Sequence, residues 1–151
     1  MSQSLAQIYI HIIFSTKNRE SFLGDETIRR EMHAYLTTVL REYDSKAIVI
    51  DGIADHVHIL CNLSRKFAVS EIIREAKRNS SKWIKTKGGT LSAFGWQNGY
   101  GAFSVSHSNV ARVRDYILRQ EEHHRKVDFR YEFRKFLNRH GIEFDERYVW
   151  D

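Results

Sequence analysis

Residues 55–60 read Asp55-His56-Val57-His58-Ile59-Leu60, a short apolar run rich in strand-forming residues. Strand side chains alternate between two faces, so His56 and His58 share one face. Val57 and Ile59 then share the other face, which we expect to cover a core. Two imidazoles on one strand face can share a metal ion, and the alternative is an exposed strand face that carries two histidines.

The composition is that of one folded domain. The chain has 151 residues, of which 42% are apolar and 28% charged, with a net charge of +5 and no proline. The positive charge favours an anionic partner. The one cysteine, Cys61, lies on the Val57 side of its strand and is expected to be a buried thiol in a reducing compartment. No apolar run approaches the roughly 20 residues of a membrane span, so we expect a soluble, cytoplasmic protein without a membrane partner.

Apolar periodicity and turn residues predict four strands and four helices. The expected strands are residues 8–14, 46–51, 56–60 and 102–106. The expected helices are 26–43 with Asp25 as cap, 71–85 with Ser70 as cap, 110–124, and a shorter helix from 129 that stops at Gly141.

This order of elements predicts an α+β, ferredoxin-like (RRM-like) split βαβ fold. Its four-stranded antiparallel sheet has two helices on one face, and the first and third strands lie side by side in the centre. Ile10 and Ile12 should therefore face the helices with Val57, which leaves His11 beside the histidine pair on the open face. In the fourth strand we expect Phe103 to face the helices, and the third helix to lie against the open face.

The expected third helix carries a second candidate motif. Tyr116 and Gln120 are four residues apart and therefore neighbours on one helical face. The amide oxygen of Gln120 could complete a His-His-Gln metal site with Tyr116 beside the ion. The alternatives are an aromatic core contact for Tyr116 and a solvated Gln120.

These motifs carry a resemblance. His56-Val57-His58 resembles the motif of HUH endonucleases, and Tyr116-x-x-x-Gln120 resembles the single-tyrosine HUH transposases of small prokaryotic insertion sequences, the IS200/IS605-like family. The similarity spans the chain, including residues 96–105 and 143–148. It implies one transposase domain over 1–151, with a core at about 5–107, a tyrosine helix at about 109–124 and a C-terminal helix and tail at 125–151.

The resemblance implies the chemistry and the partners. Tyr116 would attack a DNA phosphodiester and form a 5′-phosphotyrosine link, while His56, His58 and Gln120 hold Mg²⁺ or Mn²⁺. The implied substrate is single-stranded DNA with a hairpin, and the implied site of action is the nucleoid. The implied assembly is a homodimer, in which the tyrosine helix can complete the partner's site in trans.

Basic residues could neutralise DNA phosphates, although a solvated helix face is the plain alternative. The candidates are Lys17, Arg19, Arg74, Lys77, Arg78 and Lys82.

Two other functions share parts of this pattern. One is a non-catalytic, RRM-like nucleic-acid-binding protein, and the other is an HUH replication or relaxase-type nickase. A phosphoesterase with paired His-x-Thr motifs is excluded because Leu60 follows His58 where a hydroxyl is needed. Of the other histidines only His11 is expected near the site, and we treat the rest, His123 and His124 included, as ordinary.

Overall fold

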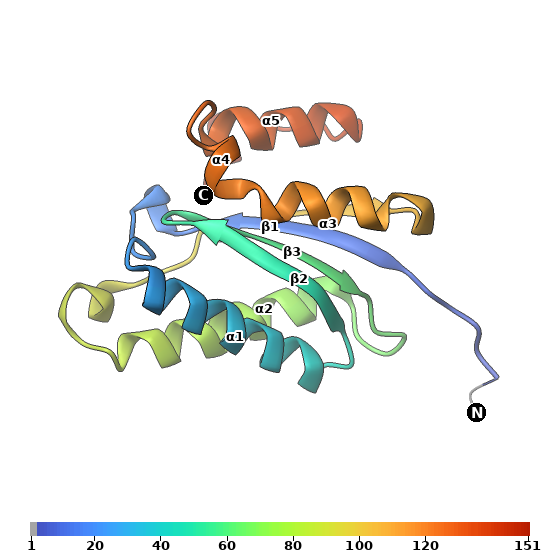
Figure 1. Cartoon of the computed structure of the whole chain (residues 1–151), viewed down its shortest axis with the longest axis horizontal. Helices are drawn as coiled ribbons and strands as arrows, with labels where there is room; N and C mark the ends of the chain where they lie inside the picture. Colours follow the sequence, from blue (N-terminus) through green and yellow to red (C-terminus); the bar gives the residue numbers. More distant parts are fainter. Residues whose placement is uncertain (1–2) are drawn as a thin grey trace.

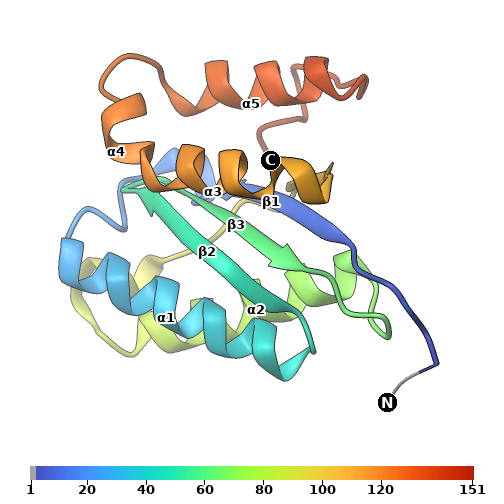
Figure 2. The ribbon, with the colours of Figure 1, turned by 45° about the vertical axis from the view of Figure 1, so that its right-hand side comes forward.

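The computed structural model describes residues 3–151 and shows a four-stranded antiparallel sheet in the order β2-β3-β1-β4. Two helices cover one face and three helices lie over the other (Figures 1 and 2). The predicted ferredoxin-like arrangement is confirmed, with β1 and β3 in the centre. The strands are β1 (Tyr9–Ser15), β2 (Lys46–Ile53), β3 (His56–Asn62) and β4 (Gly101–Val105). The helices are α1 (Glu26–Glu42), α2 (Val69–Lys85), α3 (Val110–Leu118), α4 (Gln120–His123) and α5 (Phe129–Arg139).

The face under α1 and α2 holds the larger core, and the period of two in the strands explains it. β1 and β3 contribute alternate residues that pack on the buried stripe of each helix. As predicted, Asp25 caps α1 by accepting a hydrogen bond from the backbone N–H of Ile28. Cys61 is also buried on this face, and burial raises the pKa of its thiol to about 12.

α2 begins before the predicted cap. The chain enters the helix at Ala68, which has an extended backbone and makes no side-chain cap, so the prediction that Ser70 caps α2 is wrong. Ser64, further upstream, instead accepts hydrogen bonds from the backbone N–H groups of Lys66 and Phe67. A serine hydroxyl can satisfy nearby backbone donors in a turn as well as at a helix start.

The opposite face holds a second, smaller core, formed by Ile13, Phe103, Phe129, Phe133 and Leu137. The prediction that Phe103 faces α1 and α2 is wrong. In the β1–β4 ladder Phe103 pairs with His11, and residues directly opposite each other in a sheet share a face.

β4 and α5 approach closely at Gly101. A Cβ at this position would lie 2.6 Å from Cε2 of Phe133, well inside van der Waals contact. The absence of a side chain at Gly101 therefore lets α5 settle onto the edge of the sheet.

The expected third helix is interrupted. α3 ends at Leu118, Arg119 leaves the helical region with φ −101° and ψ 19°, and Gln120 opens the short helix α4. The expectation of one continuous helix from 110 to 124 is therefore wrong. The break could not be seen in the sequence, because a single non-helical residue leaves the spacing of the apolar residues almost unchanged. At the end of α5, Gly141 has a φ of +66°, which confirms the predicted left-handed stop.

Within residues 3–151, no helix combines the length and the apolar character that a membrane crossing requires.

Candidate active site

The histidine pair lies at the centre of the face covered by α3, α4 and α5. His56 and His58 on β3 are fully buried, and their side chains leave the sheet on the side opposite Val57 and Ile59. His56 Nδ1 donates to Asp55 Oδ1 at 2.7 Å, and His58 Nδ1 lies 2.8 Å from His11 Nε2. These contacts anchor one nitrogen of each ring and turn the Nε2 atoms toward the helices. The expected position of His11 next to the pair is confirmed.

A glutamate from α5 meets the histidines. Oε1 of Glu132 lies 3.0 Å from Nε2 of His58, 3.2 Å from Nε2 of His124 and 3.5 Å from Nε2 of His56. Glu132 is 2% exposed. The donor atoms of these four residues all lie within 4.8 Å of one another, which is the convergence that a metal ion needs.

Tyr116 and Gln120 reach the same cluster from α3 and α4. The Tyr116 hydroxyl donates to Oε2 of Glu132, and its ring centre lies 6.0 Å from that of His58. Gln120 is fully buried, with Oε1 3.1 Å from His56 Nε2 and its amide N–H donating to Glu132. The four residues that the sequence singled out therefore come together within one chain.

Burial and mutual contact shift the ionisation of the whole cluster. Burial lowers the pKa of His58 to about 4. Burial would also lower the pKa of His56, but its hydrogen bonds to Asp55 and Glu132 raise it to about 9. Burial and the Glu132 carboxylate raise the pKa of the Tyr116 phenol above its usual value. A phenol held neutral in this way needs activation before it can act as a nucleophile.

Glu132 shifts in the opposite direction. Burial alone would raise its pKa, but the charge of His58 and the hydrogen bonds from His124 and His56 hold the pKa well below its usual range. The site thus keeps one buried carboxylate charge at its centre, surrounded by imidazoles.

Comparison with known proteins identifies the family. Residues 4–120 match the family described as "Transposase IS200 like". The chain belongs to the IS200-like transposase family. The transposases of insertion sequence element IS200 from Salmonella typhimurium and Salmonella typhi are each 29% identical to it over 118 residues. Each alignment covers 74% of this chain and 76% of the relative.

Two solved structures share the fold of this IS200-like transposase. A Deinococcus radiodurans protein assigned as a transposase superposes with a TM-score of 0.62 and 19% identity, over 80% of this chain and 95% of the other. A REP-associated tyrosine transposase bound to a REP hairpin gives a TM-score of 0.60 and 17% identity, over 84% of this chain and 76% of the other.

Sequence reasoning missed three side chains of the histidine cluster. The interpretation of His123 and His124 as ordinary is wrong, because both imidazoles lie within 3.3 Å of a Glu132 oxygen. His124 follows Gln120 by four residues, a spacing that could have placed the two on one face. Glu132 is an acid on the apolar stripe that contains Phe129 and Phe133, and a lone carboxylate there is a signal for a buried polar site.

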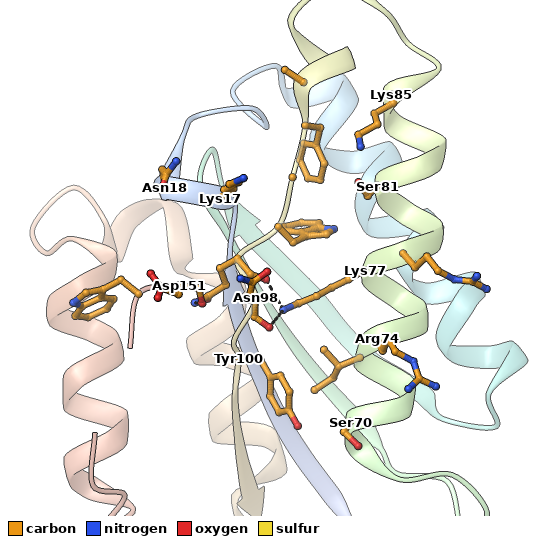
Figure 3. A pocket seen from close by; sticks show the side chains of 18 residues that line it. Lys17, Asn18, Ser70, Arg74, Lys77, Ser81, Lys85, Asn98, Tyr100 and Asp151 are labelled. Atoms are coloured by element: carbon orange, nitrogen blue, oxygen red, sulfur yellow. Dashed lines mark hydrogen bonds between the residues drawn. The ribbon is translucent and has the colours of Figure 1, made fainter. Parts of the chain in front are cut away.

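Four of the six predicted DNA-binding residues line one groove of about 850 Å³ beside α2, namely Lys17, Arg74, Lys77 and Arg78. Figure 3 shows the side chains of Lys17, Arg74 and Lys77 around this opening, together with Tyr100. Arg19 instead has its guanidinium 5.9 Å from the ring centre of Trp150, and Lys82 is not part of the lining. The residues of the histidine cluster, His56, His58, His124 and Glu132, do not line this groove.

Lys77 differs from the other basic residues of the groove. Its amine donates to the backbone carbonyls of Gln97, Asn98 and Gly99, which Figure 3 shows in part. Burial lowers the pKa of this amine to about 8. Its three donors are therefore used to hold the loop, so the structure favours a role for Lys77 in loop position rather than in phosphate contact.

Proposed function

We propose that this IS200-like transposase cleaves and rejoins single-stranded DNA through a 5′-phosphotyrosine intermediate on Tyr116, with the help of a divalent ion. The observation that supports it is the meeting of the Tyr116 hydroxyl, His56, His58 and Gln120 in one buried cluster. The family supplies the reaction class, and the cluster supplies the groups that the reaction needs.

Tyr116 is the proposed nucleophile. Its oxygen attacks the scissile phosphorus, the bond from phosphorus to the 3′ oxygen breaks, and the leaving strand ends in a free 3′-hydroxyl. A later 3′-hydroxyl reverses the step and joins new ends, because the phosphotyrosine link retains the phosphodiester bond. Glu132 Oε2 accepts the phenol hydrogen bond, which orients the attacking oxygen. Because the pKa of Glu132 is held well below its usual range, this carboxylate acts as a positioning group, the phenol proton passes to water, and the leaving 3′ oxygen takes a proton from water.

His56, His58 and Gln120 are the proposed holders of Mg²⁺ or Mn²⁺. The donors fit such an ion, since the ring nitrogens of both buried histidines belong to one cluster and Gln120 Oε1 lies 3.1 Å from His56 Nε2. A bound divalent ion would polarise the scissile phosphate and stabilise the charge that builds on it.

The proposed DNA partner is a single strand with a hairpin near the cleavage site. The structurally similar REP-associated transposase is bound to a REP hairpin, which makes this substrate class a reasonable expectation. We assign the phosphate contacts to Lys17, Arg74 and Arg78, and base stacking to Tyr100, whose side chain is 39% exposed at the groove.

A covalent-adduct assay tests the nucleophile. Protein, Mn²⁺ or Mg²⁺ and single-stranded oligonucleotides that carry the element's ends are mixed and separated on a denaturing gel. We expect a metal-dependent protein–DNA band that is lost in Tyr116→Phe and in His58→Ala. The matched control is Tyr131→Phe, an exposed tyrosine on α5 that should leave the band unchanged. Binding of the ends without any adduct would favour the non-catalytic binder, and cleavage without rejoining would favour the nickase.

A homodimer remains part of the proposal, but we assign Tyr116 to the histidines of its own chain, because the hydroxyl already contacts their cluster. Mixing Tyr116→Phe with His58→Ala protein tests this assignment. Each protein lacks one half of a site, so the mixture should form no adduct if the tyrosine acts in cis. Restored adduct formation would show exchange between two copies.

A further inference from the structure

The carboxylate of Glu132 is surrounded by the imidazole nitrogens of three histidines. Three Nε2 atoms, those of His56, His58 and His124, lie 3.0 to 3.5 Å from its Oε1. The side chains of Glu132 and His124 are 1% and 3% exposed. A buried charge is costly unless it is paired or coordinates a metal.

These separations match those between ligands of one metal ion. Bonds of about 2.0–2.2 Å from an ion to nitrogen or oxygen place neighbouring ligand atoms about 3.0–3.5 Å apart in tetrahedral or octahedral geometry. Each of the three distances from Glu132 Oε1 falls within that interval. All four donor atoms lie within 4.8 Å of one another, so they can converge on one ion.

The far nitrogen of each ring supports the same reading. His56 Nδ1 donates to Asp55, His58 Nδ1 contacts His11, and His124 Nδ1 donates to the carbonyl of Val127 at 2.7 Å. Metal-binding histidines typically have the second nitrogen anchored in this way, which fixes the orientation of the ring. All three rings are thus held with Nε2 toward the centre.

We propose that Glu132 and His124 are direct ligands of the divalent ion, together with His56 and His58. The inference rests on the proposed function, to which it adds two ligands and a class of metal. Gln120 keeps its place, because its Oε1 is 3.1 Å from His56 Nε2. The ion then links β3 to both α4 and α5, and α5 becomes part of the catalytic site.

This ligand set selects among metals. Mg²⁺ prefers oxygen ligands and retains much of its water, whereas imidazole suits transition metals. Three imidazoles and one carboxylate therefore favour Mn²⁺ over Mg²⁺, and Co²⁺ or Zn²⁺ over Mn²⁺.

Metal binding by the full chain, without DNA, tests the proposal. After chelator treatment, the dissociation constants for Mn²⁺ and Mg²⁺ are measured by calorimetry, with circular dichroism as a check on folding. Loss of a ligand should weaken Mn²⁺ binding more than about 10-fold in both Glu132→Gln and His124→Ala, since loss of outer partners already costs 10- to 100-fold. The matched controls are Glu122→Ala and His107→Ala, which change an exposed acid and an exposed histidine.

A second readout does not depend on affinity. Pulsed electron paramagnetic resonance of the Mn²⁺-loaded protein detects nitrogen from bound imidazoles. We expect three imidazoles in the wild type and two in His124→Ala, at metal concentrations that saturate both proteins.

Wild-type Mn²⁺ affinity in both Glu132→Gln and His124→Ala would overturn the inference. So would a higher adduct yield in Glu132→Gln with unchanged Mn²⁺ affinity, because the carboxylate would then occupy the place of the scissile phosphate. Failure of the proposed function has a different signature, since the wild type would bind Mn²⁺ as expected and yet form no adduct on Tyr116.

Discussion

The two faces of the sheet are built on opposite principles. The face under α1 and α2 is a continuous apolar core to which Ile12, Phe14, Val57 and Ile59 contribute. The face under α3, α4 and α5 buries six polar side chains to 2% exposure or less, namely His11, Ser15, His56, His58, Gln120 and Glu132. The first face is stabilised by the burial of apolar side chains. The second holds polar groups whose burial is tolerated only because they form hydrogen bonds with one another.

The two faces of the sheet therefore differ in what a substitution is expected to change. Apolar packing is tolerant of similar side chains, whereas each polar group on the other face has particular partners. Loss of one partner there leaves a buried donor or acceptor unpaired, which costs about 1–3 kcal/mol. We therefore expect changes on the first face to alter the unfolding free energy alone, and changes on the second face to alter metal binding and cleavage as well.

The largest expected effect is on the apolar face. Leu36→Ala removes a fully buried side chain of α1 and should lower the free energy of unfolding by about 3 kcal/mol, measured by denaturant titration. The Mn²⁺ affinity of the folded protein should remain at the wild-type value. A weaker metal site in this variant would show that the two faces are not independent.

Metal should stabilise the polar face. At a Mn²⁺ concentration 100 times the dissociation constant, the free energy of unfolding should rise by about 2.7 kcal/mol, because the ion binds the folded state. Removal of the metal by a chelator should reverse the gain. His58→Ala lacks one buried donor of the cluster and should show no such rise, and an equal rise in that variant would exclude His58 as a ligand.

Lys77 lies outside both cores, and its substitution tests whether it holds the loop of the groove or binds DNA phosphates. Lys77→Met keeps the length of the chain but removes the donors to three loop carbonyls, so we expect a loss of about 1–2 kcal/mol in unfolding free energy. Arg78→Gln changes an exposed side chain and should leave stability unchanged. For DNA binding we expect the opposite order of effects. Arg78→Gln should lower the slope of the logarithm of the binding constant against the logarithm of the salt concentration by about one, and Lys77→Met should change this slope less. Equal salt slopes in the two variants would refute this division.

The smallest effect concerns His33 on α1, whose buried Nε2 has no hydrogen-bond partner within residues 3–151. Burial lowers its pKa to about 4. The unfolded chain therefore binds more protons between about pH 6.5 and 4, and stability falls as the pH falls through that window. Because the ring is partly exposed, we expect a loss on the order of 1 kcal/mol at pH 5 relative to pH 7.

His33→Leu isolates this contribution. Since the site histidines titrate alike in both proteins, the variant should lose less stability than the wild type between pH 7 and 5. Identical losses would mean that His33 has an ordinary pKa in the folded protein.

The sequence predicted the site residues correctly where the repeat of a strand or helix alone decides the face on which a side chain lies. The period of two placed His56 and His58 opposite Val57, and the spacing of four paired Tyr116 with Gln120. Phe103 was assigned to the wrong face because β4 is short and alternates two apolar residues with small ones. Its side is set by pairing with β1, which the residues of β4 do not encode.

The rest of the site depends on contacts between distant segments. Glu132 is 74 residues from His58, and only the packing of α5 on the sheet brings them together. His124 turns toward the cluster after the break at Arg119, which no local pattern marks.

The missing side chain at Gly101 sets the reach of a distant carboxylate. Phe133, which would collide with a Cβ at this position, is the residue next to Glu132 on α5. The depth to which that ring sinks onto the outermost strand fixes how far Glu132 extends toward His58. The edge strand β4 thus limits how closely α5, and with it Glu132, approaches the histidines. Substitutions along this edge would change the affinity of the proposed metal site while every proposed ligand stays the same.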